Sequence, residues 1–310
     1  MRSLYKLFVN PMGHFFRSLN RTQQATVYMM GMVLMFAMLE TTAKSLTQTY
    51  SVVEIVWFRY IAHFLIMLIV FVPKFGVKMV RTNNPKEQLL RATLLMGSTG
   101  FYFTSLSFLP LATAKSISFV SPLLVTVFAC WILKEVVSAS RWIAVVVGFL
   151  GVLFVVNPTQ HFDWHFLLPL VAATCYSLYQ IMTRNFSNRE DAVTTLFYTA
   201  LVGTVVLSFM IPFFWVLPKL IDLPKFLFLG VAGAAGHFML IKAMGLEQAS
   251  FLSPLGYVQL IWVTIFGFIA FGHLPDMTGF IGMFVIVLAG LYVALGHKTK
   301  SREVPDTAIE

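Results

Sequence analysis

Long apolar segments separated by short polar connections are the feature that most limits what this chain can form. Each is close to the roughly 20 residues that a helix needs to cross a bilayer, and none alternates as the strands of a membrane barrel do. Only 11% of the residues are charged, against about 25% in soluble domains. We therefore predict an all-α polytopic membrane protein with ten transmembrane helices. The predicted segments are residues 25–43, 53–73, 89–109, 113–133, 141–156, 166–183, 193–216, 224–244, 249–271 and 277–296.

The basic residues predict the orientation of these segments. A net charge of +9 in a soluble protein would suggest nucleic acid, but here most of the 22 basic residues lie in alternate loops. Such a bias marks cytoplasmic loops. It predicts a bacterial-type cytoplasmic (inner) membrane, both termini in the cytoplasm and no nucleic-acid partner. Lys44, Lys219 and Lys225 are then outside, and Arg59 and Lys115 lie within spans.

The sequence also repeats at low similarity. Residues 34–60 align without a gap on residues 174–200, which places Glu40 opposite Gln180. Five helices in each copy make the two copies inverted across the membrane, an architecture of secondary transporters. The N-terminal segment is either an amphipathic helix on the membrane surface or a disordered tail. The predicted divisions are a cytoplasmic segment 1–24, a first repeat 25–156, a periplasmic linker 157–165, a second repeat 166–296 and a cytoplasmic tail 297–310.

Several short patterns carry a resemblance to a known family. They are LPLA at 109–112, FVSPLL at 119–124, RW at 141–142 and GFLGVLFVVNP at 148–158, with a weaker set in the second half. The chain resembles the EamA-domain transporters of the drug/metabolite transporter superfamily. The resemblance implies two inverted EamA-type repeats and alternating access to a central cavity. His273 and Lys115 depart from it, because the family usually has Glu at the first position and a small or hydroxyl residue at the second.

Three charged residues lie in the outer part of the predicted membrane region. Glu40, Arg59 and Lys115 would form a charged vestibule in which Glu40 pairs with one cation and the other binds an anionic substrate group. A structural alternative stays open. Glu40 and Lys44, four residues apart, would pair along one helix, and Arg59 and Lys115 would extend to the interface.

Polar and aromatic side chains form the other candidate binding groups. Tyr176, Tyr179 and Gln180 share one helical stripe, which predicts contact with protein or a water-filled cavity. Packing between helices, or a static kink for the prolines, is the alternative for each candidate. The remaining substrate-binding candidates are Tyr102, Ser118, His237, Tyr257, Gln259 and Trp262, and the gating candidates are Arg59, Lys44, Pro122 and Pro254.

These features predict a secondary active or facilitative transporter rather than an enzyme. The resemblance to EamA-domain transporters implies that the substrate is a small organic metabolite that is amino-acid-like, nucleoside-like, a vitamin or S-adenosylmethionine-like. No cofactor and no metal is predicted, because no catalytic, nucleotide-binding or metal-binding pattern is present. The predicted partners are the substrate and the lipid bilayer, with protons, a counter-substrate or a second copy of the chain as further candidates. The alternative is a non-transporting membrane scaffold or accessory subunit.

Overall fold

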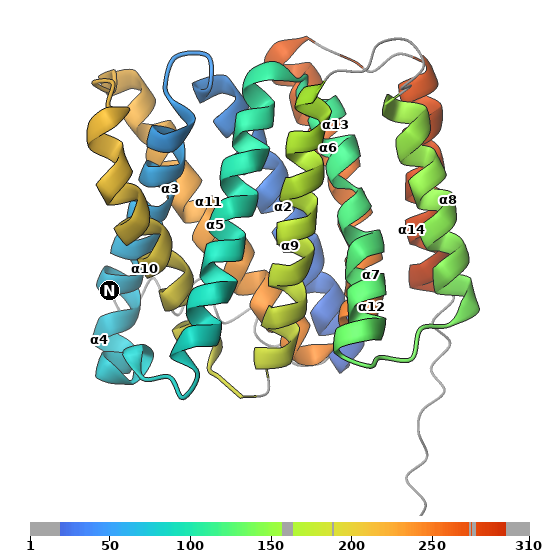
Figure 1. Ribbon diagram of the computed structural model, residues 1–310, viewed down its shortest axis with the longest axis horizontal. Helices are drawn as coiled ribbons and strands as arrows, with labels where there is room; N and C mark the ends of the chain where they lie inside the picture. The colour runs from blue at the N-terminus through green and yellow to red at the C-terminus, as the bar shows by residue number, and fades with distance from the viewer. Residues whose placement is uncertain (1–18, 157–163, 188, 273, 275–276, 296–310) are drawn as a thin grey trace, which may run out of the picture.

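A computed structural model describes residues 19–156, 164–187, 189–272, 274 and 277–295. Residues 1–18 of the predicted N-terminal segment, most of the linker, the C-terminal tail and His273 lie outside these residues. The described part consists of helices and their connections and contains no strand. Figure 1 shows its helices standing side by side in one layered bundle.

The first half contains α2 to α8. α2 (Arg21–Leu46) begins with a capping box, in which Asn20 and Gln23 each accept the other's backbone N–H; this arrangement satisfies amides that the first turn leaves free. The other elements are α3 (Val52–Ile66), a π-helical turn η1 (Met67–Phe71), α4 (Val72–Phe75), η2 (Gly76–Val80), α5 (Pro85–Phe108), α6 (Leu111–Ser118), α7 (Val120–Ile132) and α8 (Ala139–Val156).

The second half contains η3 to α14. Its elements are η3 (Trp164–Phe166), α9 (Leu167–Phe186), α10 (Ala192–Met210), η4 (Ile211–Phe213), η5 (Leu220–Asp222), α11 (Leu223–Leu246), α12 (Ala249–Leu252), η6 (Ser253–Tyr257), α13 (Val258–Phe271) and α14 (Met277–Leu295).

Each predicted segment overlaps a helical part of the chain. Six segments are long and apolar enough to cross a membrane, and three shorter apolar helices accompany them among the described residues. α5 carries Lys86, Glu87 and Arg91 near its start, and it is not among these nine. The chain is therefore a multi-pass helical membrane protein, whereas ten crossings stays a prediction.

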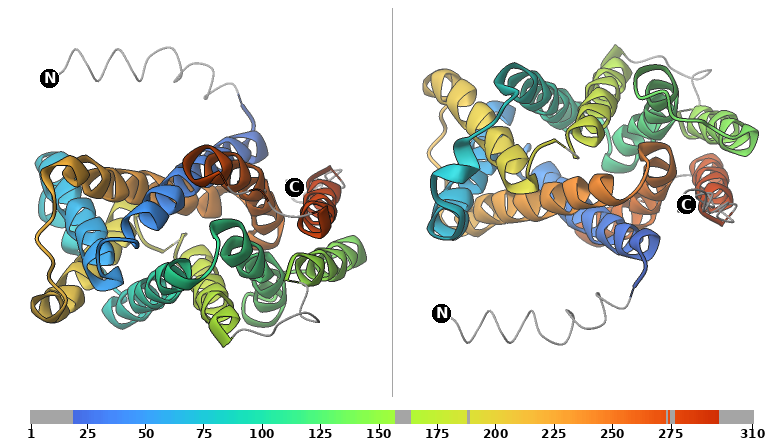
Figure 2. Two further views of the ribbon diagram at one scale, coloured as in Figure 1. Left: turned by 90° about the horizontal axis from the view of Figure 1, so that it is seen from above. Right: turned by 90° about the horizontal axis from the view of Figure 1, so that it is seen from below.

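Several helices of the first half pack against helices of the second half. α2 packs along α11, and α9 packs along α5; α2 also contacts α13, and α9 contacts α7. α8 pairs with α14, and α3 pairs with α10, so equivalent helices also meet each other. Seen from above, two rows of helices face each other along the long axis (Figure 2). This is the packing that two related halves produce.

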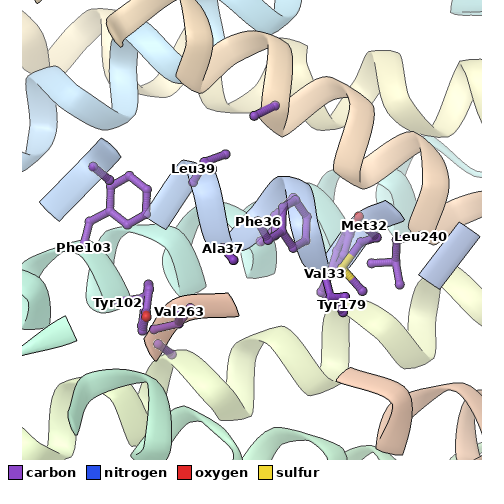
Figure 3. Packing of buried hydrophobic residues seen from close by; sticks show 14 of the residues in the cluster. Met32, Val33, Phe36, Ala37, Leu39, Tyr102, Phe103, Tyr179, Leu240 and Val263 are labelled. Atoms are coloured by element: carbon purple, nitrogen blue, oxygen red, sulfur yellow. The ribbon is translucent and has the colours of Figure 1, made fainter. Parts of the chain in front are cut away.

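The core lies between these rows and is centred on α2. Apolar side chains from five helices meet there (Figure 3). Packing of this kind holds membrane helices together, because lipid gives little hydrophobic drive for their association. The contributing residues include Met32, Val33, Phe36, Ala37, Leu39, Tyr102, Phe103, Tyr179, Leu240 and Val263.

Two segments of the bundle are interrupted close to a proline. α6 ends at Ser118 and α7 begins at Val120, two residues before Pro122. In the second half α12 gives way to η6, which contains Pro254. A proline inside a helix removes one hydrogen bond and pushes away the carbonyl four residues earlier, which accounts for both interruptions.

Gly230 sets the approach of α11 to α3. A Cβ on this residue would lie 2.2 Å from the Cβ of Ala62 and 3.0 Å from backbone atoms of Ala62 and His63. We expect Gly230→Ala to force the helices apart and to destabilise the protein by about 1–3 kcal/mol. Thermal unfolding in detergent measures this. Gly97→Ala in α5 is the control, since its Cβ would meet nothing within 4 Å; an equal loss there would contradict the packing role.

Candidate functional site

A cavity of about 120 Å³ opens in the core between the two rows of helices. It has room for roughly ten water molecules. Residues from α2, α3, α5, α6, α7, α9, α11, η6 and α13 line it, so both halves of the chain contribute. Ten of the predicted site residues lie on its wall: Glu40, Arg59, Tyr102, Lys115, Ser118, Pro122, Tyr176, Gln180, His237 and Gln259.

Glu40 is the centre of one polar cluster in this wall. Its Oε1 lies 2.7 Å from the Lys115 ammonium and accepts a hydrogen bond from the Gln259 amide at 3.0 Å. The Tyr102 hydroxyl donates to Oε2 at 3.2 Å. A buried carboxylate needs such partners because its charged form is costly away from water. The cluster joins α2, α5, α6 and α13 at one point.

Arg59 is the centre of a second cluster. Its guanidinium donates to the Thr99 hydroxyl and to Nε2 of His237, both at 2.8 Å. Its side chain is almost fully buried, and its Nε has no hydrogen-bond partner. No carboxylate among the described residues forms an ion pair with it. Arg59 is therefore a buried cation of the cavity wall, and its Nε, which lies against Gly233, has no acceptor.

His237 links Arg59 to Tyr179. Arginine has no acceptor atom, so Nε2 of His237 must be the unprotonated nitrogen and the imidazole is neutral. Its Nδ1 then donates to the Tyr179 hydroxyl at 3.2 Å. Tyr179 itself is fully buried behind the cavity wall and stacks with Tyr176, whose ring lines the cavity. Of the predicted helical stripe, Tyr176 and Gln180 therefore line the cavity, and Tyr179 lies behind them.

Lys44 does not pair with Glu40. Its ammonium donates instead to the backbone oxygens of Leu106 and Leu109, at the end of α5. Carbonyls at a helix end have no partner within the helix and accept well from a cation. The alternative of a pair along α2 is therefore absent in this structure, and Lys115 holds the position instead.

Two other predicted site residues lie away from the cavity wall. Tyr257 is buried against Phe119 and its hydroxyl has no partner, although neighbouring Gly256 lines the cavity. Trp262 is half-buried and stacks on Phe266. Pro254, a gating candidate, lies in η6, the segment that also contains Gly256. Their roles in binding stay predictions.

The cavity also contains groups that the sequence did not single out. Thr99 holds Arg59, and Phe36, Phe103 and Ser121 are also part of the wall. Arg91, near the start of the predicted segment 89–109, is completely buried and bonded to Thr183, Thr195 and Thr199. The sequence offered one sign of this contact, because Thr195 and Thr199 are four residues apart and lie on one face of a helix, where they can bind a buried polar side chain.

These features define a multi-pass helical membrane protein with a charged central cavity built by two related halves. The EamA-like transporter family matches residues 23–157 and 163–295. The chain belongs to the EamA-like transporter family. It is accordingly a small-metabolite transporter and not an enzyme.

Named relatives and a solved structure agree with this assignment. The S-adenosylmethionine uptake transporter of Rickettsia bellii is 29% identical over 246 residues, which cover 79% of this chain and 84% of the relative. The riboflavin transporter of Vibrio cholerae is 25% identical over 244 residues, with 77% and 81% covered. A crystal structure with 18% identity covers 88% of this chain and 97% of its own, with a TM-score of 0.73, and shows the same fold.

Proposed function

We propose that this protein imports a small organic metabolite that carries a carboxylate and a positively charged centre. S-adenosylmethionine is the leading candidate. The carrier would lie in a bacterial cytoplasmic membrane with both termini inside, and its two inverted repeats would expose the cavity to each side in turn. The bias of basic residues supports the orientation. The relatives named as uptake transporters support the direction.

The single observation that supports a carboxylate is Arg59. Glu40 and Lys115 neutralise each other, and His237 accepts from Arg59 as a neutral ring. The cavity wall therefore carries one uncompensated positive charge, which is that of Arg59. A buried cation without a counter-ion is costly, and a guanidinium suits a carboxylate through parallel N–H donors. A substrate carboxylate in the cavity would supply the missing negative charge beside the guanidinium.

The same charges favour S-adenosylmethionine over riboflavin. Riboflavin has neutral rings and a chain of hydroxyls, so it would leave Arg59 unpaired. S-adenosylmethionine offers a carboxylate for Arg59 and cationic groups for the carboxylate of Glu40. Its adenine would stack on an aromatic wall that includes Phe36, Phe103 and Tyr176.

The interrupted helices support alternating access. The break at Phe119 and the η6 turn at Gly256 both reach the cavity wall. Discontinuous helices at a site between repeats are common in transporters, and they offer places where the chain can bend. A scaffold, the alternative function, has no need of buried charges around a cavity of this size.

An uptake assay tests the proposal directly. Proteoliposomes would be offered amino acids, nucleosides, riboflavin and S-adenosylmethionine, and the contents identified by mass spectrometry with and without an imposed pH gradient. We expect S-adenosylmethionine to enter. Entry of riboflavin alone would overturn the substrate class, and entry of nothing under either condition would favour the scaffold. A dependence on the gradient would point to Glu40 or His237 as a proton carrier.

Tyr176 and Trp262 form a matched pair for the aromatic wall. Tyr176 lines the cavity, whereas Trp262 does not. Base stacking on an aromatic ring contributes about 1–3 kcal/mol, so we expect Tyr176→Ala to raise KM for S-adenosylmethionine by about tenfold. Trp262→Ala should leave KM unchanged in any protein that folds. The opposite order of effects would place the substrate against α13 instead.

A further inference from the structure

The Lys115 ammonium occupies a position that is built to hold a cation. Glu40 lies 2.7 Å away, and the ring centroids of Tyr102 and Phe119 lie 5.4 Å and 5.5 Å from Nζ. A carboxylate beside aromatic faces is also the arrangement that recognises organic ammonium groups in ligands. All four side chains line the cavity. The position is therefore open to a ligand as well as to Lys115.

The cation position does not depend on Lys115 for its shape. Tyr102 and Gln259 donate to Glu40 from α5 and α13, so the carboxylate stays oriented when Lys115 leaves. Lys115 is the mobile partner, because its four-carbon stem rotates freely. It also sits three residues before the end of α6, next to the break in that segment.

We propose that Lys115 is a tethered stand-in for the cationic group of the substrate. When the substrate enters, its ammonium or sulfonium takes the place of Nζ against Glu40 between Tyr102 and Phe119. When the substrate leaves, Lys115 returns. This inference rests on the proposed function, and it assigns the second recognition point of the same cavity.

The stand-in determines which transport modes are open to the carrier. An empty carrier must change its conformation with Glu40 buried, and an unpaired buried carboxylate opposes this step. Lys115 neutralises Glu40 in the empty state, so the carrier can return without cargo and deliver net uptake. Without Lys115, Glu40 is neutralised only when substrate is bound. Such a carrier exchanges substrate for substrate but does not accumulate it.

Chemical rescue tests the cation position without knowledge of the substrate. Lys115→Ala opens a space that propylammonium can enter, and we expect this amine to raise the melting temperature of the variant by several degrees. Wild type and the double variant Glu40→Gln, Lys115→Ala should not respond. If Lys115→Ala does not fold, Lys115→Met with the ammonium ion replaces it, because methionine lacks only the terminal nitrogen position. A folded variant that ignores the amine, or an equal response of the double variant, would overturn the proposal.

Transport by Lys115→Ala tests the consequence. We expect net uptake of S-adenosylmethionine into empty proteoliposomes to fall about tenfold or more, while exchange into preloaded proteoliposomes is kept. Equal loss of both modes, or retention of both, would contradict the stand-in role. If wild type takes up no metabolite while amine rescue succeeds, the proposed function fails and the cation position stands. If wild type takes up S-adenosylmethionine and amine rescue fails, the proposed function stands and the cation position is wrong.

Discussion

Replacing Arg59 with glutamine is expected to reduce uptake of S-adenosylmethionine more than any other single change in the cavity. The variant removes the positive charge that would bind the substrate carboxylate. Loss of one partner of a buried charged pair costs about 2–5 kcal/mol, so kcat/KM should fall about 30-fold or more. Initial rates of labelled uptake into proteoliposomes measure this.

Two further variants separate binding from folding. Arg59→Lys keeps the charge but loses the planar fork of donors, and it should lie between wild type and the glutamine variant. Lys44→Gln removes another cation, on the same helix as Glu40. The Lys44 ammonium donates to the backbone oxygens of Leu106 and Leu109, which do not line the cavity. Its KM should match wild type. If Lys44→Gln and Arg59→Gln were equally impaired, Arg59 would have no special role.

The largest loss of stability is expected for Glu40→Ala. This change leaves the Lys115 ammonium buried without its carboxylate, and it also removes the acceptor of Tyr102 and Gln259. Breaking one side of a buried ion pair costs about 3–5 kcal/mol. Thermal unfolding of the purified protein in detergent should show a correspondingly large decrease in the melting temperature.

The partner substitution provides the control for this effect. Glu40→Ala with Lys115→Met removes both charges, and such replacements are often close to neutral. We expect the double variant to be more stable than Glu40→Ala alone, and the difference measures the coupling of the two residues. Simple addition of the two single effects would show that the ion pair contributes nothing to the fold.

The helices were predictable because hydrocarbon leaves the backbone few alternatives. Each predicted segment overlaps a helix, and the interruptions fall close to Pro122 and Pro254, where a proline disrupts the helical hydrogen bonds. The inverted relation of the halves, the number of crossings and the orientation stay predictions. A second copy of the chain as partner is likewise untested by the packing within one chain.

The pairing of the cavity charges was only partly predictable. The sequence placed Glu40, Lys115 and Arg59 in one membrane region, but the spacing alone allowed Lys44 to pair with Glu40. The end of α5 decides this, because its carbonyls bind Lys44 instead. Such contacts depend on how distant helices pack, and helical spacing does not contain that information.

Two residues show why charge and spacing mislead inside a membrane protein. Arg91 counts as a charge on the cytoplasmic side, near the start of the predicted segment 89–109, yet threonine hydroxyls and a backbone oxygen hold it buried between helices. Trp262 follows Gln259 by three residues on α13, yet Gln259 lines the cavity and Trp262 does not. The rule for basic residues in cytoplasmic loops counts charges without regard to whether they are buried. Uniformly apolar segments carry little information on which helical face points into the protein.

The most direct test of a carboxylate-binding cavity compares two ligands on two proteins. Dissociation constants would be measured for S-adenosylmethionine and its decarboxylated form, with wild type and with Arg59→Gln. If Arg59 binds the carboxylate, decarboxylation should weaken binding to wild type about 30-fold or more and should change binding to Arg59→Gln about threefold at most. An equal effect of decarboxylation on both proteins would show that Arg59 does not meet the carboxylate, and the account of the cavity would be wrong.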